Sequence, residues 1–192
     1  MGPGIRHVLT NRNIYQLTSS ACAPSFIIKR LEKHNQAVGC NYSNEKANEL
    51  INLRSLSTVV LAMSKKHELI DWEETIRVLK EKGVNKVIII GPVPQWKPSL
   101  PKVYVKRHMG SEFINDARFD YSLLKTNNIM KTRMKNIEGV VYVDLINALC
   151  KVEIEELLCK AKIGQALLVF DYGHLTTEGA IFVAENLLEE YL

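Results

Sequence analysis

The chain has 192 residues, a length that suits one domain with a sizeable core, and we expect residues 1–192 to form that single domain. Its hydrophobic fraction of 46% and charged fraction of 24% are ordinary for a globular protein, and a net charge of +4 does not indicate a nucleic-acid partner. No apolar run approaches the length needed to cross a bilayer, and the first residues lack the apolar region of a secretion signal.

The hydrophobic pattern predicts alternating helices and strands. At the start of the chain, Ile5, Val8 and Leu9 indicate a short helix, which is followed by a short strand at about 13–17. The further predicted elements are, in chain order, a helix near 43–53, a buried strand at 57–63, an amphipathic helix at 71–82, a strand at 86–90, a long helix within about 116–136, a strand at 140–143, a strand at 166–170 and a helix from about 177 to 191.

Fully apolar strands separated by helices are typical of a parallel sheet that is covered on both faces. The predicted fold class is therefore a three-layer α/β sandwich. In such sheets ligands bind beyond the carboxyl ends of the strands, so we expect a site in the loops after residues 63, 90 and 170. An unrelated cytosolic flavodoxin-like protein is disfavoured, because no glycine-rich phosphate-binding turn follows any predicted strand.

The most informative motif follows the last predicted strand and reads Asp171-Tyr-Gly-His174-Leu-Thr-Thr-Glu-Gly-Ala180. An Asp and a His three residues apart, just before a helix, can both face the carboxyl edge of the sheet. There Asp171 would hold the imidazole tautomer, and His174 would take a proton from a hydroxyl group. A lone Asp-x-x-His is common by chance, and its simpler interpretation is a turn-capping Asp171 beside a half-buried His174.

In its context the motif resembles the last block of SGNH/GDSL hydrolases. It is most similar to the periplasmic SGNH domain that is fused to acyltransferase-3 membrane proteins, the O-antigen and other polysaccharide acetylases. The resemblance covers nearly the whole chain in order and spacing. The further similar stretches are Tyr15-Gln-Leu-Thr-Ser-Ser-Ala-Cys22-Ala-Pro24, Val59-Val-Leu-Ala62, Ile90-Gly-Pro-Val-Pro94, and Val143-Asp-Leu-(x)4-Cys150 followed by Cys159.

The resemblance implies serine-dependent O-acyl transfer or deacylation on a cell-envelope carbohydrate, with Asp171 and His174 as two members of the catalytic triad and no cofactor. It implies a flavodoxin-like sheet with strand order 2-1-3-4-5. The implied partners are a polysaccharide or O-antigen acceptor and an acyltransferase-3 membrane domain in the full-length parent, with no nucleic acid. The implied compartment is the periplasm, and the cytoplasm is the alternative.

Three departures from the family pattern change these expectations. The chain contains no Gly-Asp-Ser turn, which carries the nucleophile directly after the first, central strand of SGNH enzymes. Residues 2–9 resemble the helix after that turn, so we expect the first central strand and its serine to be missing, either upstream in a longer parent or lost from the reading frame. The Gly-x-Asn-Asp oxyanion block is also absent, and Met63-Ser64 stands where a tryptophan is usual.

Without the serine hydroxyl, we expect the chain as given to be inactive in acyl transfer. The alternative is a non-catalytic carbohydrate-binding module or a degenerate fragment. Loss of a central strand would also leave unpaired backbone groups on its two neighbours. Either 14–17 slides against 57–63, or another chain fills the gap and makes an oligomer through the exposed edge, or the fragment is poorly stable.

Substrate contacts are expected in two loops. Met63 and Ser64 follow one strand, and Pro94 and Trp96 lie in the proline-rich loop after the next. A tryptophan there would stack on a sugar ring, whereas the alternative is a tryptophan that only packs the loop.

Four cysteines allow three pairings. The resemblance favours two disulfides, Cys22 with Cys40 and Cys150 with Cys159, and the alternative is four reduced thiols in a cytosolic protein. No Cys-x-x-Cys is present, and histidines such as His67 have no partners at ligand spacing. We therefore expect no metal site, and we expect these histidines on the surface.

Overall fold

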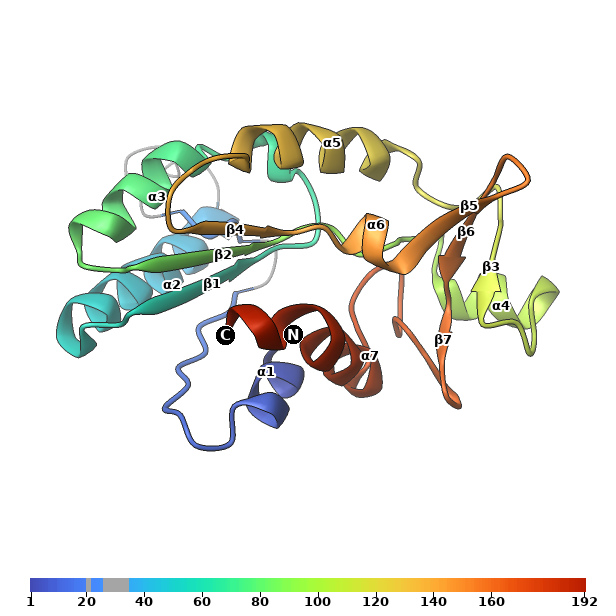
Figure 1. Ribbon diagram of the computed structural model, residues 1–192, viewed down its shortest axis with the longest axis horizontal. Helices are drawn as coiled ribbons and strands as arrows, with labels where there is room; N and C mark the ends of the chain where they lie inside the picture. Colours follow the sequence, from blue (N-terminus) through green and yellow to red (C-terminus); the bar gives the residue numbers. More distant parts are fainter. Residues whose placement is uncertain (20–21, 26–34) are drawn as a thin grey trace.

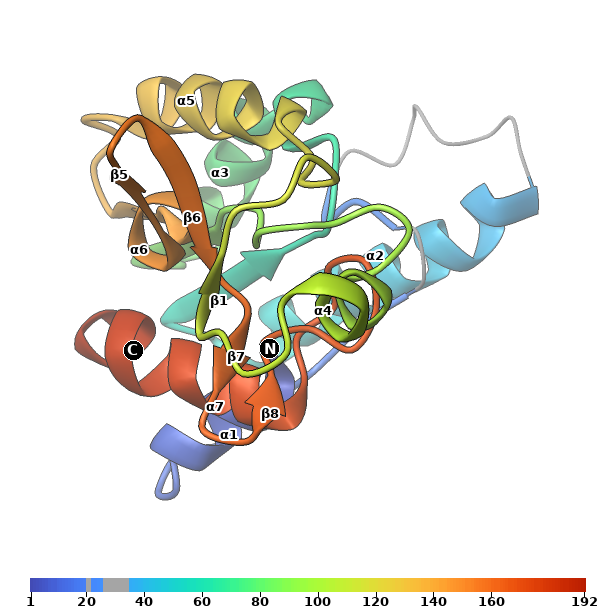
Figure 2. The same ribbon diagram turned by 90° about the vertical axis from the view of Figure 1, so that its right-hand side faces the viewer.

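The structure is a computed structural model that describes residues 1–19, 22–25 and 35–192. Figures 1 and 2 show it from two sides. Its α-helices are α1 (Gly2–Val8), α2 (Asn35–Arg54), α3 (Trp72–Glu81), α4 (Leu100–Arg107), α5 (Ser122–Met134), α6 (Leu145–Leu149) and α7 (Thr177–Val183). Its strands are β1 (Thr58–Ala62), β2 (Lys86–Ile90), β3 (Phe113–Ile114), β4 (Val140–Val143), β5 (Cys150–Glu153), β6 (Glu156–Lys160), β7 (Lys162–Ile163) and β8 (Ala166–Leu167).

The core of the fold is a parallel sheet in the order β1-β2-β4. Thr58 lies opposite Lys86, and Val87 lies opposite Val140, so the three strands run side by side in the same direction. Their sequences consist largely of β-branched residues, which pack well on a pleated surface. The predicted α/β class with a parallel sheet is confirmed.

Helices cover both faces of this sheet, because side chains along a strand point alternately to opposite faces. On one face Ile88 and Ile90 of the middle strand belong to a hydrophobic cluster that includes residues of α7 and α6. On the other face Val87 and Ile89 pack in a cluster with α3 and with Met130 of α5. Figure 1 shows α3 and α5 above the sheet and α1 and α7 below it, so the three-layer arrangement is confirmed.

Helix α3 illustrates how the local sequence sets an element. Asp71 precedes it, and its carboxylate accepts a hydrogen bond from the backbone N–H of Glu74 at 3.2 Å, which satisfies one free donor of the first turn. Trp72, Ile76 and Leu79 recur at helical spacing and are all buried. This combination of a cap and an apolar stripe is why residues 71–82 were predictable as a helix.

The strand expected at 13–17 is not present. Residues 13–19 have no regular secondary structure, and they make no backbone hydrogen bond to β1 in the described part of the chain. A groove of about 420 Å³ lies between them and β1, and both sides line it. The expectation that 14–17 pairs with the neighbouring strand is therefore wrong, because the two backbones are too far apart for a ladder.

The prediction of a strand at 166–170 is also wrong, both in the length of the strand and in the strand with which it pairs. Only Ala166–Leu167 form a strand, β8, and it pairs antiparallel with β7 rather than with the parallel sheet. Gly164, at a φ of +56°, turns the chain back between them, a conformation that glycine adopts at little cost. Beyond the pair, Val169 makes a single antiparallel bridge with Leu175.

The final helix changes form along its length. α7 ends at Val183, and the chain continues as a π-helical segment, Ala184–Leu188, and a short 3-10 turn, Glu189–Tyr191. Helix α1 packs beside α7 (Figures 1 and 2). The contact is close at Gly4, where an added Cβ would lie 1.9 Å from the carbonyl oxygen of Ala180.

A small antiparallel sheet in the order β3-β6-β5 was not predicted. β5 and β6 form a hairpin near α6 (Figure 2), and Cys150 lies opposite Cys159 in its register. Because the segment is short and its apolar residues are interrupted by glutamates, its sequence gives only a weak strand signal.

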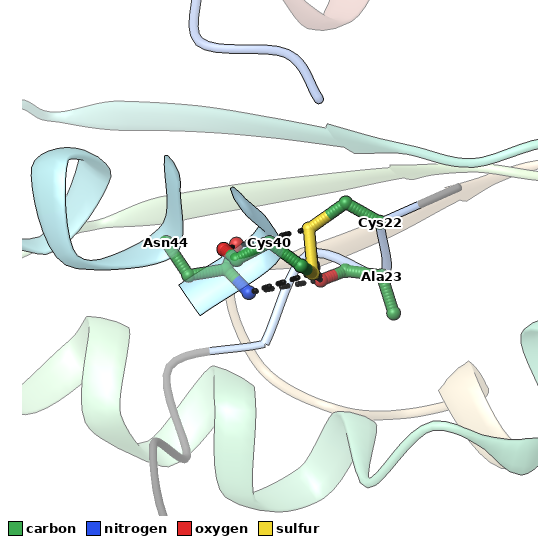
Figure 3. The surroundings of a disulfide bond; sticks show 4 residues. All are labelled: Cys22, Ala23, Cys40 and Asn44. Carbon is green, nitrogen blue, oxygen red and sulfur yellow. Dashed lines mark hydrogen bonds between the residues drawn. A yellow bond between two sulfur atoms is a disulfide. The ribbon is translucent and has the colours of Figure 1, made fainter. Parts of the chain in front are cut away.

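Both expected disulfides are present. Cys150 is bonded to Cys159 across the β5–β6 hairpin. Cys22 is bonded to Cys40 and thereby joins the segment before α2 to that helix (Figure 3). Asn44, one turn further along α2, donates its side-chain amide to the carbonyl oxygen of Ala23 at 3.0 Å, so a hydrogen bond supports the same connection.

Candidate functional site

The turn from Phe170 to His174 is the centre of the candidate site. The backbone N–H of Phe170 donates to the carbonyl of His174 at 2.9 Å and closes the turn. Two backbone N–H groups that follow β2 in the chain bind this turn. Trp96, in the loop after β2, donates to the carbonyl of Tyr172 at 3.1 Å, and Leu100, the first residue of α4, donates to the carbonyl of Asp171 at 3.0 Å. These bonds connect the turn to the carboxyl end of the parallel sheet.

The two carboxylate oxygens of Asp171 make hydrogen bonds to different groups. Oδ1 accepts the backbone N–H groups of Gly173 at 2.9 Å and of His174 at 2.8 Å, which caps the turn. Oδ2 lies 2.6 Å from Nδ1 of the His174 ring. The turn-capping interpretation and the acid–imidazole interpretation are thus both realised, one by each oxygen.

This arrangement orients the imidazole for proton transfer. Burial raises the pKa of Asp171, but the hydrogen bonds from the two backbone N–H groups and from His174 outweigh it and hold the pKa below its usual value of 3.8. Asp171 is therefore ionised at neutral pH and accepts a hydrogen bond from Nδ1–H of His174, and in this tautomer the lone pair of the neutral ring lies on Nε2. Half of the His174 side chain is exposed, and Nε2 has no hydrogen-bond partner among the described residues.

Aromatic side chains surround the imidazole. The ring of Phe170 stacks on it with centroids 5.8 Å apart, and the ring of Tyr172 meets it edge-on at 5.2 Å. Lys65, from the loop after β1, places its ammonium 4.2 Å from the Tyr172 ring centroid, a cation–π contact. Phe170 is 62% exposed and so presents an apolar face to solvent beside His174.

Gln95 connects three loops of the site, and the sequence analysis missed it. Its side-chain amide donates to the carbonyl oxygen of Ser64 at 2.7 Å, and its residue is only 2% exposed. The Cα of Gly173 lies directly against it, since an added Cβ there would be 2.6 Å from Cγ of Gln95. Its position as the polar residue within the apolar loop Gly-Pro-Val-Pro-Gln-Trp was the available signal.

The expected substrate contacts have different outcomes. Trp96 is fully buried and packs edge-on against Phe119 at 5.9 Å, so the expectation that it stacks on a sugar ring is wrong and its packing role holds. Pro94 is buried in the same loop and offers no surface to a ligand. Met63 and Ser64 are half-buried beside the site, and whether they contact substrate stays a prediction.

His67, expected on the surface, is fully buried. Burial lowers its pKa to about 4, so the ring is neutral at neutral pH. Its backbone carbonyl accepts the indole N–H of Trp72 at 2.7 Å, and Trp72 is fully buried as well. A histidine that stands between Lys66 and Glu68 in the sequence gives no signal for such burial.

Helix α7 begins directly after the turn. Thr176 caps it, because its hydroxyl accepts the backbone N–H of Gly179 at 2.9 Å and donates to the carbonyl of Leu167 at 2.7 Å. Gly179 lets the helix approach the preceding segment, where an added Cβ would lie 2.3 Å from the carbonyl oxygen of Leu168. The cap and the glycine therefore fix where α7 begins, close behind the turn that carries His174.

Within the described residues, no group of three or more His, Cys, Asp or Glu side chains is arranged to hold a metal ion. Across the same residues, no helix combines the length and the apolar character needed to span a membrane.

A parallel sheet covered by helices on both faces defines the three-layer α/β class of proteins. Residues 1–189 match the family model described as the SGNH domain fused to AT3 domains, and the chain belongs to this family. No curated protein matches it in sequence.

A solved structure supports the fold. It is the periplasmic domain of the lipopolysaccharide acetyltransferase of Salmonella ser. Paratyphi A, with a TM-score of 0.73 and 19% sequence identity. The match covers 96% of this chain and 76% of that chain. At this identity the similarity establishes the shared fold.

Proposed function

We propose that this domain serves O-acyl transfer or deacylation on a cell-envelope carbohydrate, with His174 as general base and Asp171 as the carboxylate that orients it. The observation that carries the proposal is the 2.6 Å contact between Oδ2 of Asp171 and Nδ1 of His174, which leaves Nε2 open to solvent. Membership of the SGNH family and a fold shared with the periplasmic domain of a lipopolysaccharide acetyltransferase support it.

In the proposed step one C–O bond forms, another breaks, and one proton passes through His174. A hydroxyl oxygen attacks the acyl carbonyl carbon while its proton passes to Nε2 of His174, and Asp171 stabilises the resulting imidazolium. When the tetrahedral intermediate collapses, the bond to the leaving oxygen breaks and Nε2 returns the proton to it. No serine or threonine hydroxyl among the described residues bonds to Nε2. We therefore propose that residues 1–192 alone do not turn over, and that the nucleophile comes from outside them.

The proposed setting is the periplasm. The disulfides Cys22–Cys40 and Cys150–Cys159 are stable in an oxidising compartment, and such bonds are rare in the cytosol. The family model describes domains fused to AT3 domains, which supports a membrane acyltransferase-3 domain as the partner within the full-length protein. That domain would supply the acyl group, and the acceptor would be a polysaccharide such as O-antigen.

A second candidate function is non-catalytic carbohydrate binding. It is favoured by the exposed ring of Phe170, which lies at 62% exposure beside the imidazole and Tyr172. An exposed aromatic face of this kind packs against the apolar face of a sugar ring. In this function His174 would hold Phe170 in place and transfer no proton.

The two functions are separated by matched variants. In the full-length protein, His174→Ala is expected to lower acyl transfer by roughly 10³-fold or more, while residues 1–192 alone should show no His174-dependent hydrolysis of p-nitrophenyl acetate. The control Phe170→Ala leaves the acid–imidazole contact intact and should reduce oligosaccharide binding instead. Full acyl transfer by the His174→Ala protein would refute the catalytic proposal. Oligosaccharide binding that depends on Phe170 but not on His174 would then favour the second function.

A further inference from the structure

The loop after β1 carries a lysine that lies beside the turn of the Asp–His couple. Lys65 is exposed, and its ammonium lies 4.2 Å from the centroid of the Tyr172 ring. The same ring meets the imidazole of His174 edge-on, with centroids 5.2 Å apart. Because both groups contact one tyrosine ring, a ligand that reaches Nε2 of His174 also lies near a positive charge.

The backbone on both sides of Lys65 is fixed. The carbonyl of Ser64 accepts the side-chain amide of Gln95 at 2.7 Å, and Gln95 is only 2% exposed. Two residues beyond the lysine, His67 is fully buried, and its carbonyl accepts the indole N–H of Trp72 at 2.7 Å. Because both of these anchors are buried, the backbone of Lys65 is held at the edge of the site while its side chain stays exposed.

The charge of Lys65 has no opposite charge beside it. Among the described residues Lys65 forms no ion pair, whereas Lys97 in the loop after β2 pairs with Asp120 at 3.1 Å. The turn itself offers the carboxylate of Asp171, whose two oxygens already accept hydrogen bonds from within the turn. An anionic group on a ligand would therefore find a free ammonium next to the imidazole.

Phe170 supplies an apolar surface next to the same imidazole. It is 62% exposed, and its ring stacks on the His174 ring with centroids 5.8 Å apart. The C–H face of a sugar ring packs against an exposed aromatic face of this kind. Phe170, Nε2 of His174 and the ammonium of Lys65 thus match three groups of one ligand: an apolar sugar face, a hydroxyl group and an anionic substituent.

We propose that the acceptor is an acidic sugar whose carboxylate or phosphate group binds the ammonium of Lys65 while a hydroxyl group of the sugar meets Nε2 of His174. This inference rests on the proposed function, because it names the class of acceptor for the same site. Lys65 determines which acceptor binds and takes no part in the proton transfer. Tyr172 orients the ammonium, since a cation–π contact favours a position over the ring.

Three sugars that differ only in the group at the sixth carbon test the role of Lys65: galactose, galacturonate and galactose 6-phosphate. Each is titrated into residues 1–192, and binding is followed by the NMR shifts of the Tyr172 and His174 rings. We expect both anions to bind roughly tenfold or more tightly than galactose, as a hydrogen bond between charged groups allows. The preference should weaken at high salt, because salt screens exposed charges. The anion that binds more tightly identifies the natural group as a carboxylate or a phosphate.

Variants of two neighbouring lysines separate this contact from a general effect of charge. Lys65→Gln should bind galactose as before and lose the preference for the anions. Lys65→Arg keeps the positive charge and should keep the preference. The control Lys66→Gln removes the same charge one residue further along the loop, from a lysine that contacts no ring of the described residues. It should change the preference by less than about twofold.

Three results would overturn the proposal: equal binding of galactose and both anions, a preference for the anions that survives in Lys65→Gln, or an equal loss of the preference in Lys66→Gln. None of these binding measurements depends on acyl transfer. Full acyl transfer by the His174→Ala variant of the full-length protein would contradict the catalytic role instead, so failure of the acceptor proposal is distinct from failure of the proposed function.

Discussion

The buried carboxylate of Asp116 allows a quantitative test of the structure. Its side chain is 2% exposed, and Oδ2 lies 2.9 Å from Nε2 of His108. Oδ1 accepts the backbone N–H of Arg118 at 2.9 Å and its guanidinium Nε at 3.0 Å. Burial raises the pKa of Asp116, but these hydrogen bonds outweigh burial and lower the pKa from 3.8 to about 2. Ionised Asp116 is therefore more stable in the folded chain than in the unfolded chain.

The lowered pKa of Asp116 predicts how much its ionisation stabilises the fold and over which pH range that stabilisation is lost. A pKa lowered by nearly two units corresponds to about 2 kcal/mol of folding free energy. Because the folded-state pKa is the lower one, this stability is fully present above pH 3.8 and is lost as the pH falls toward 2. Asp116→Asn should therefore lower the free energy of unfolding by about 2 kcal/mol at pH 7, and the deficit should shrink as the pH falls through this range.

Urea unfolding at pH 7 and at pH 3 measures both quantities. With a slope of ~2 kcal/mol per molar urea, the midpoint of Asp116→Asn should fall by about 1 M at pH 7. The control Glu156→Gln removes an exposed carboxylate that has no ion pair among the described residues, and it should leave the midpoint unchanged. Equal midpoints for the two variants at pH 7, or a deficit of Asp116→Asn that persists undiminished at low pH, would refute the reasoning.

Two further changes test the packing and the cross-links. Gly4→Ala would place a Cβ 1.9 Å from the carbonyl oxygen of Ala180, so we expect a loss of roughly 1–3 kcal/mol in urea unfolding as α1 shifts. Gly39→Ala, with nothing nearer than 4.0 Å, should instead gain about 0.5–1 kcal/mol, and equal effects of the two would contradict this contact. Replacing Cys150 and Cys159 by Ser removes a cross-link with a sequence separation of 9, and we expect the free energy of unfolding to fall by about 3 kcal/mol. The thermal midpoint should be lower than that of the oxidised chain, and an equal midpoint would count against the disulfide.

The parallel sheet was predictable because its strands are short runs of apolar, mostly β-branched residues. The β-branched side chains favour an extended backbone, and their apolar character favours burial, so both preferences indicate a buried strand. Helix α3 was predictable for a similar reason, since an N-cap and an apolar stripe are local signals. The couple of Asp171 and His174 also follows from local spacing, because both residues lie in one tight turn.

Other parts depend on contacts that local sequence does not encode. Residues 13–17 have the composition of a strand, but a strand forms only beside a partner backbone, and the described chain places a groove there. The buried Trp96 and the bridging Gln95 owe their positions to loops from distant parts of the chain that meet at the sheet edge. The sequence of the loop indicates stiffness but not which side chains turn inward.

The sequence by itself therefore determined the α/β class, the parallel strands and the Asp–His couple, because each depends on residues that are neighbours along the chain. The tertiary structure alone decided that Phe170 rather than Trp96 is exposed at the site, and that β1 has a free edge along a groove. Both outcomes depend on which distant segments pack together. Burial and strand pairing are properties of that packing and not of any single segment.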